Sequence, residues 1–170
     1  MNDKKIRNII KSEQLKLKDE EFANIMQALD IKDKKERYIF LYDRTCEYLD
    51  SFFYGKNYCD FRDNKCGEKR TTNSTIGCCR HYKNKFLGPF LIGNKFVKCE
   101  YLGEDCKCSA KCLSCKLYTC DYLEKKGVKF NIDDIPYLYL FFNPIQKWII
   151  KTSVYTTKEK IIKKLLKYSF

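Results

Sequence analysis

The chain has 170 residues, a formal net charge of +12, 11 cysteines and one histidine. This length corresponds to one domain, and a composition with 44% hydrophobic and 15% aromatic residues supplies a core, which excludes global disorder. Seven glycines and three prolines exclude a collagen-like chain, and no apolar run reaches the roughly 18 residues that span a bilayer.

The cysteines are the most unusual feature of the composition. The N-terminal residues carry Lys11 and Glu13 within their apolar pattern and lack the apolar stretch of a secretory signal. We therefore expect a cytoplasmic protein, and disulfides are rare in a reducing compartment. An odd number of cysteines also cannot be paired completely within one chain. Both points favour metal binding over a disulfide framework.

The cysteines divide the chain into three parts, which we predict to form a single domain over residues 1–170. Residues 1–58 contain only Cys46, residues 59–120 contain the other ten, and residues 121–170 contain none. The first and last parts have helical periodicity, whereas the middle part has turn-forming residues between short apolar runs. The predicted fold is mainly α, with N- and C-terminal helices packed around an irregular, cysteine-rich metal-binding centre.

Three helices are predicted in the first part from apolar residues at spacings of three and four. Asp19 is expected to cap the second helix. Asp33 and Glu36 resemble a capping box at the start of the third. Cys46 falls on the apolar face of the third helix, so we expect a packed thiol there and not a metal ligand.

In the last part, Asp133 or Asp134 is expected to cap a helix that begins near Pro136 and has an apolar, buried body. Pro144 should end that helix, and Asn143 should cap the one that follows.

A final helix is predicted from a capping box at Thr156 and Glu159. Its isoleucine and leucine stripe is expected to pack on the core and to leave its lysines in water. A helix that lies on a membrane surface is the alternative.

The ten cysteines of the middle part are the candidate metal ligands. They are Cys59, Cys66, Cys78, Cys79, Cys99, Cys106, Cys108, Cys112, Cys115 and Cys120. Only Cys112 and Cys115 form a C-x2-C pair, whereas structural zinc sites usually use two short pairs. A cubane cluster collects thiolates from more widely separated loops, so the spacing favours an iron–sulfur cluster, most simply [4Fe–4S], with zinc as the alternative. Packed thiols and disulfides are the less favoured interpretations.

The run Gly77-Cys78-Cys79-Arg80, followed by Cys99-Glu100-Tyr101-Leu102-Gly103 and the later cysteines, resembles the YkgJ-type cysteine-cluster family over about residues 59–122. That family is described as zinc- or iron-chelating and includes relatives of flagellin lysine N-methylase. The resemblance implies metal chelation at Cys78, Cys79, Cys99, Cys106, Cys112, Cys115 and Cys120. The compact cysteine opening of the family is absent here. Methyl transfer is not carried over, because the chain lacks a glycine-rich cofactor loop.

Other candidate residues carry weaker signals. His81 follows the cysteine pair and is more often a polar contact than a ligand. The basic and aromatic stretch of residues 80–86 has the composition to bind phosphates and stack on bases, but we expect a solvated loop beside the metal site.

The basic charge favours an anionic partner, either nucleic acid or an acidic protein. The leading prediction is a cytoplasmic metal–thiolate protein with one or more iron–sulfur clusters in a structural or redox role. The alternatives are a zinc-stabilised nucleic-acid-binding or interaction module, and a protein-modifying enzyme related to the flagellin lysine methylases. No catalytic residue or substrate is identified.

Overall fold

The structure is a computed structural model. It describes the backbone of residues 3–12, 16–53, 61–62, 65–66, 80–87, 90–98, 112–119, 121–154 and 156–169. In the strands only the backbone is described.

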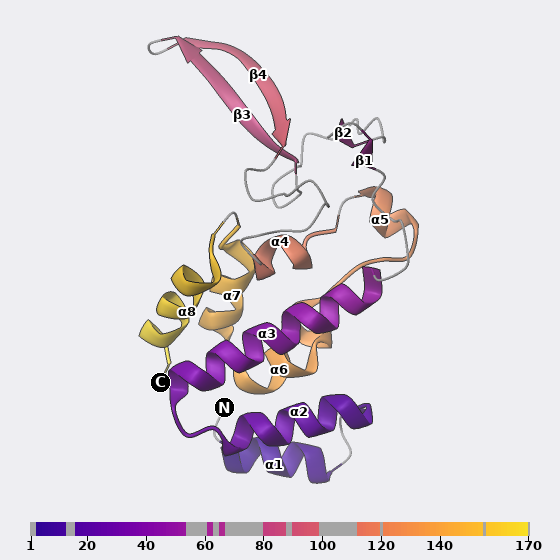
Figure 1. Ribbon diagram of the computed structural model, residues 1–170, viewed down its shortest axis with the longest axis vertical. Coiled ribbons are helices and arrows are strands. Elements are labelled where there is room, and N and C mark those ends of the chain that lie inside the picture. Colours follow the sequence, from indigo (N-terminus) through magenta and orange to yellow (C-terminus); the bar gives the residue numbers. More distant parts are fainter. Residues whose placement is uncertain are drawn as a thin grey trace.

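The described part of the chain is mainly helical, as predicted. Its helices are α1 (Asp3–Lys11), α2 (Asp19–Asp30), α3 (Lys34–Phe53), α4 (Leu113–Leu117), α5 (Asp121–Lys125), the 3-10 turn η1 (Ile132–Asp134), α6 (Pro136–Phe141), α7 (Pro144–Thr152) and α8 (Lys158–Lys167). Figure 1 shows α3 crossing the helical body, with α1 and α2 along one side and α4, α7 and α8 on the other. None of the described helices is both long enough and apolar enough to cross a membrane.

Two antiparallel hairpins lie at the end of the helical body that carries α4 and α5 (Figure 1). The small hairpin pairs β1 (Phe61–Arg62) with β2 (Lys65–Cys66), and the larger one pairs β3 (Arg80–Leu87) with β4 (Phe90–Lys98). The expectation of an irregular middle part is wrong for these segments, and the expected loop over residues 80–86 is a strand. β3 contains the aromatic residues Tyr82 and Phe86, and β4 contains Phe90, Ile92, Phe96 and Val97; aromatic and β-branched residues favour extended backbone.

The N-cap predicted for α2 is wrong, whereas the one predicted for α3 is confirmed. The N-cap of α2 is Lys18 and not Asp19, because the Glu21 carboxylate accepts a hydrogen bond from the Lys18 amide at 2.9 Å. At α3 the Asp33 carboxylate accepts from the Glu36 amide at 2.8 Å, as predicted. Such contacts satisfy backbone donors that a helix start leaves unpaired.

The helix that begins at Pro136 is confirmed, but Ile135 is its N-cap. Asp133 and Asp134 belong to η1, so the prediction that one of them caps α6 is wrong. The body of α6 is buried as expected, apart from Tyr139, which is 40% exposed.

The cap between α6 and α7 is confirmed in detail. The Asn143 side-chain oxygen accepts from the Gln146 amide at 2.9 Å, and the Asn143 amide donates to the Gln146 side chain at 3.0 Å. This reciprocal pair is a capping box, and Pro144 occupies the first turn of α7, where no amide donor is needed.

The start of α8 lies one residue later than predicted. Thr157 is the N-cap, whereas the Thr156 hydroxyl donates to the Val154 carbonyl. The Glu159 carboxylate accepts from its own amide and from the Thr157 hydroxyl, and both contacts lower its pKa. The apolar stripe of α8 is buried and its outer lysines are exposed, so its predicted docking on the core is confirmed.

The described helices other than α5 share one hydrophobic core around α3, and Leu123 of α5 packs with Val128 in a small separate cluster. The buried residues of α3 are Tyr38, Leu41, Tyr42, Thr45, Cys46 and Leu49. A buried amide, Gln146, donates to the Tyr38 hydroxyl at 2.8 Å and to the Leu165 carbonyl at 3.0 Å. Gln146 therefore joins α3, α7 and α8.

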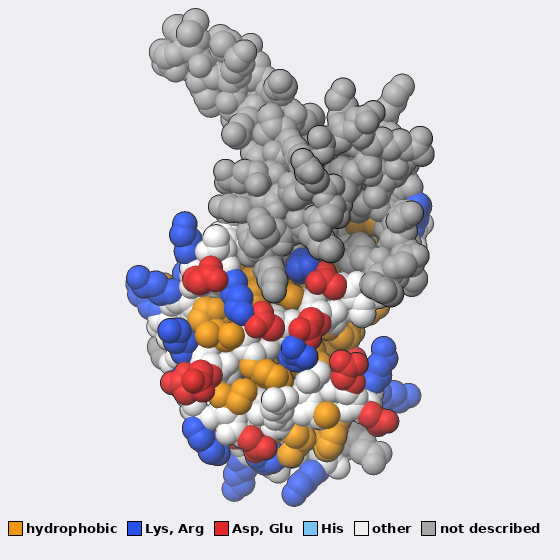
Figure 2. Space-filling view, in the orientation of Figure 1, with side chains coloured by type: hydrophobic (Ala, Val, Ile, Leu, Met, Phe, Trp, Pro, Cys, Tyr) orange, Lys and Arg blue, Asp and Glu red, His pale blue; other side chains and the backbone are white. Residues whose placement is uncertain are grey.

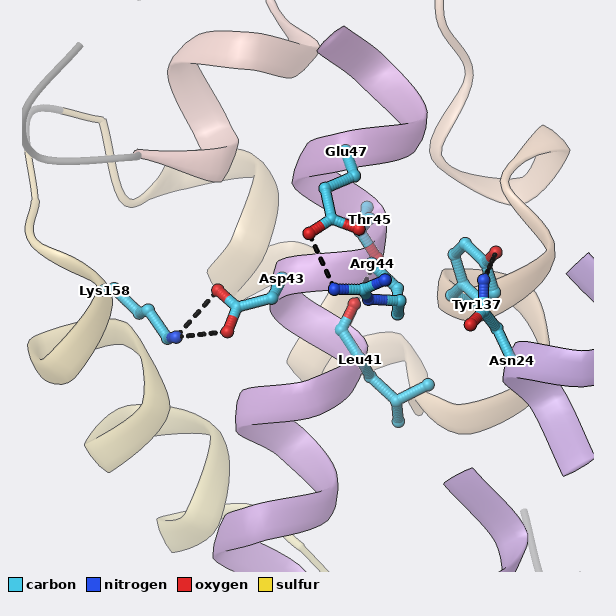
Figure 3. A network of polar contacts seen from close by, with 8 residues as sticks. All are labelled: Asn24, Leu41, Asp43, Arg44, Thr45, Glu47, Tyr137 and Lys158. Atoms are coloured by element: carbon cyan, nitrogen blue, oxygen red, sulfur yellow. Dashed lines mark hydrogen bonds and ion pairs between the residues drawn. The ribbon is translucent and has the colours of Figure 1, made fainter. Parts of the chain in front are cut away.

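Polar contacts at the edge of the core complete the packing (Figure 3). Lys158 of α8 donates to both carboxylate oxygens of Asp43, at 2.6 and 2.7 Å, and Asn24 of α2 donates to the Tyr137 hydroxyl at 3.2 Å. The Lys158–Asp43 pair is partly exposed, so its main effect is to fix the position of α8 against α3.

We predict that Gln146→Ala lowers the free energy of unfolding by about 2–3 kcal/mol, because the substitution leaves buried partners without hydrogen bonds. Lys151→Ala, an exposed substitution on the same helix, should change it by less than about 0.5 kcal/mol. Chemical denaturation followed by circular dichroism measures both values. Equal effects of the two substitutions would contradict the assigned role of Gln146.

Candidate metal centre

The structure places two of the ten predicted ligands with their side chains, Cys112 and Cys115, and both are thiols. Cys66 is described by its backbone alone, in β2. The remaining predicted ligands lie outside the described residues: Cys59, Cys78, Cys79, Cys99, Cys106, Cys108 and Cys120. Within the part of the chain that the structure describes, no three or more cysteine, histidine, aspartate or glutamate side chains are grouped to hold a metal ion.

The Cys112–Cys115 pair lies at the start of α4. Cys112 is the N-cap residue, and its carbonyl accepts from the Lys116 amide at 3.1 Å. Cys112, Leu113 and Ser114 are buried, whereas Cys115 is partly exposed. The pair therefore presents one sulfur from inside the helical body and one from its surface.

Three side-chain contacts anchor this short helix to the helical body. The Leu113 amide donates to the Tyr42 hydroxyl of α3 at 2.8 Å. The Ser114 hydroxyl donates to the Ile150 carbonyl of α7, and Lys116 forms an ion pair with Asp50 of α3. The anchors therefore attach α4 to two helices, α3 and α7.

The Cys112 sulfur has partners for both of its protonation states. As a thiol it donates to the Ser153 carbonyl at 3.3 Å. The pKa of Cys112 is lowered to about 6, mainly by a hydrogen bond from the Cys115 thiol; the amides of Thr156, Cys115 and Ser114 act in the same direction, and burial opposes them. Donors directed at a sulfur favour its thiolate, which is the form that binds metals.

Cys46 is buried on α3 with 5% exposure, which confirms the prediction of a packed thiol. Cys46 lies one turn after Tyr42 on α3, and the Tyr42 hydroxyl accepts from the Leu113 amide at 2.8 Å. Burial raises the pKa of the Tyr42 phenol, and the charges of Cys46, Cys112 and Cys115 raise it further, whereas its bond with Leu113 lowers it.

Tyr42 is the residue that the sequence did not reveal as part of this site. Its position on an apolar helix face predicted only a core residue. Its contact with Leu113 joins residues 71 positions apart, and no local pattern encodes that pairing. A tyrosine in a core position signals that its hydroxyl needs a polar partner, which was the only available indication.

The other candidates of the middle part are located by backbone only. His81 lies in β3 opposite Val97 of β4, and the basic and aromatic stretch of residues 80–86 forms most of β3. Their roles as ligand or anion contact stay predictions.

Comparisons with known proteins return no match to a family model, to a curated protein or to a solved structure. The resemblance to the YkgJ-type family therefore stays a prediction that rests on the cysteine pattern.

We predict that Tyr42→Phe lowers the free energy of unfolding by about 1–3 kcal/mol and speeds hydrogen exchange at the Leu113 amide, because a buried donor loses its acceptor. Tyr139→Phe removes a hydroxyl from an exposed position of α6 and is the matched control. Exchange at Leu113 that is equally slow in both variants would show that Tyr42 does not hold α4.

Proposed function

We propose that this protein is a metal–thiolate protein that binds an iron–sulfur cluster, most simply [4Fe–4S], through its central cysteines. The cluster has a structural or a redox role. The observation that carries the proposal is the attachment of the Cys112–Cys115 pair to the helical body by contacts from α3 and α7.

The anchoring of α4 supports ligation because it fixes two thiols before a metal arrives. A helix of five residues is too short to be stable by itself, so the position of α4 depends on these contacts. A pair of thiols on a rigid element loses little conformational freedom when it binds a metal.

Two thiols are half of a tetrahedral or cubane ligand set, which needs four. The remaining ligands of the proposed site come from the other eight cysteines of residues 59–120. The YkgJ-type resemblance is consistent with this set, since it implies chelation at Cys78, Cys79, Cys99, Cys106 and Cys120 as well.

The choice of iron–sulfur over zinc rests on the spacing of these cysteines. Cys112–Cys115 is the single C-x2-C pair, and the other intervals vary from adjacent residues to 19 intervening ones. Long and unequal intervals suit a cluster that is larger than one ion. Zinc bound by the same thiolates is the alternative.

The first test is the metal content of the full chain purified without oxygen. We predict a brown protein that absorbs near about 400 nm and contains iron and acid-labile sulfide. Colourless protein with stoichiometric zinc would contradict the choice of metal. A folded protein with neither metal would contradict the proposal as a whole.

The second test assigns the ligands. Cys112→Ser and Cys115→Ser should each reduce bound iron and sulfide by more than half, because each removes one thiolate. Cys46→Ala is the control, since Cys46 is a packed thiol on α3 and should keep the full metal content. Helical circular dichroism shows whether each variant is folded. Loss of metal in the control alone would refute the assignment.

A further inference from the structure

The charge of the described helices is distributed unevenly. Helices α1 to α3 lie within residues 3–53, which contain equal numbers of acidic and basic residues. Residues 144–167, which include α7 and α8, contain seven lysines and a single acidic residue, Glu159. Figure 2 shows basic side chains projecting from the edge of the molecule where Figure 1 places α8.

The lysines on the outside of α8 differ from those at the helix contacts. Lys147 and Lys158 form ion pairs of 2.6 Å with Asp133 and Asp43, which neutralise them. Lys160, Lys163 and Lys164 are exposed, and no carboxylate in the described ranges lies within ion-pair distance of them. Their charge is available to a partner.

The spacing of these lysines produces a continuous row. Lys160, Lys163, Lys164 and Lys167 are exposed at intervals of three and four residues, so they share the outer face of α8. At the helical rise the row spans about 10 Å, which is enough to contact successive phosphates of one strand.

An exposed tryptophan lies on the neighbouring helix. Trp148 of α7 is 65% exposed, the largest exposure among the large apolar side chains of the described residues, and Ile145 on the same helix is 45% exposed. The two helices are packed against each other, since Gln146 donates to the Leu165 carbonyl and Asn143 to the Tyr168 carbonyl. An exposed tryptophan indole offers a flat surface on which a base can stack.

We propose that the α7–α8 surface, defined by Trp148, Lys160, Lys163, Lys164 and Lys167, binds single-stranded nucleic acid. The lysine row contacts the phosphates and Trp148 stacks on a base. Positive charge with an aromatic platform is the combination used for such strands without sequence preference. This inference does not depend on the metal proposed above.

A membrane surface is the less suitable polyanion. The apolar stripe of α8 is buried in the core, where Ile161 and Leu165 have 0% exposure. On α7 the exposed large apolar side chains are Ile145 and Trp148, which are too few to insert into a membrane surface as the apolar face of an amphipathic helix does. Stacking of a nucleic-acid base, by contrast, requires a single exposed aromatic ring, which Trp148 supplies.

Trp148 is the single tryptophan of the chain and reports directly on the proposed contact. Titration of the purified full chain with an unlabelled single-stranded RNA of mixed sequence should quench its fluorescence. Binding of a fluorescent copy of that RNA, measured by anisotropy, should weaken steeply as salt is raised. Quenching by anionic phospholipid vesicles or a blue shift with them, without an effect of RNA, would show a membrane partner and overturn the proposal.

Two triple variants that remove the same positive charge from different places show whether RNA binding depends on the α7–α8 surface or only on the net charge of the protein. The triple variant Lys160→Gln, Lys163→Gln, Lys164→Gln should weaken RNA binding about tenfold or more. The control triple Lys4→Gln, Lys32→Gln, Lys35→Gln removes the same charge from exposed positions of the N-terminal part and should weaken it less than about twofold. Trp148→Phe should retain most of the affinity, and Trp148→Ala should lose about tenfold of it. Equal losses in both triples, or no binding at low salt, would overturn the proposal.

Discussion

The buried face of α3 is the feature on which the described structure depends, because α2, α4, α6 and α8 all pack against it. Its apolar residues supply the centre of the core, and its polar side chains hold the neighbouring helices in position through hydrogen bonds. Tyr38 binds Gln146, Tyr42 binds Leu113, and Asp43 binds Lys158. Short helices such as α4 gain their stability from this packing and not from their own propensity. The position of the Cys112–Cys115 pair is therefore determined by a helix more than sixty residues away in the sequence.

The proposed cluster and the proposed nucleic-acid surface meet at α7. The Ile150 carbonyl of this helix accepts from Ser114, and the carbonyl of Ser153, directly after the helix, accepts from the Cys112 thiol. Trp148 projects from the same helix and is largely exposed. The helical body has its own hydrophobic core, so we expect it to fold without metal. Binding energy from metal coordination would then contribute to the folding of the cysteine-rich segment.

Local patterns in the sequence were enough to predict most helices. The Asn143–Gln146 cap, the break at Pro144 and the buried stripe of α8 follow from residues within one or two turns of each other. Caps were placed wrongly where the helix begins after a residue whose side chain makes no cap hydrogen bond, as at Ile135 and Thr157. Short strands at residues 86–87 and 90–92 were one interpretation of the sequence, but the length and pairing of β3 and β4 were not predicted, because pairing between strands depends on contacts that helical periodicity does not detect. The anchors of α4 were not predictable, since they join α4 to side chains and carbonyls that only tertiary packing brings near.

The central claim is that sulfur atoms of the central cysteines, including Cys112 and Cys115, surround a metal. X-ray absorption at the iron and zinc edges of the full chain, purified without oxygen, tests this most directly. We predict iron with a first shell of sulfur alone and neighbouring iron atoms in the second shell. A shell of oxygen and nitrogen alone around the bound metal, or the absence of both metals from a folded protein, would contradict it.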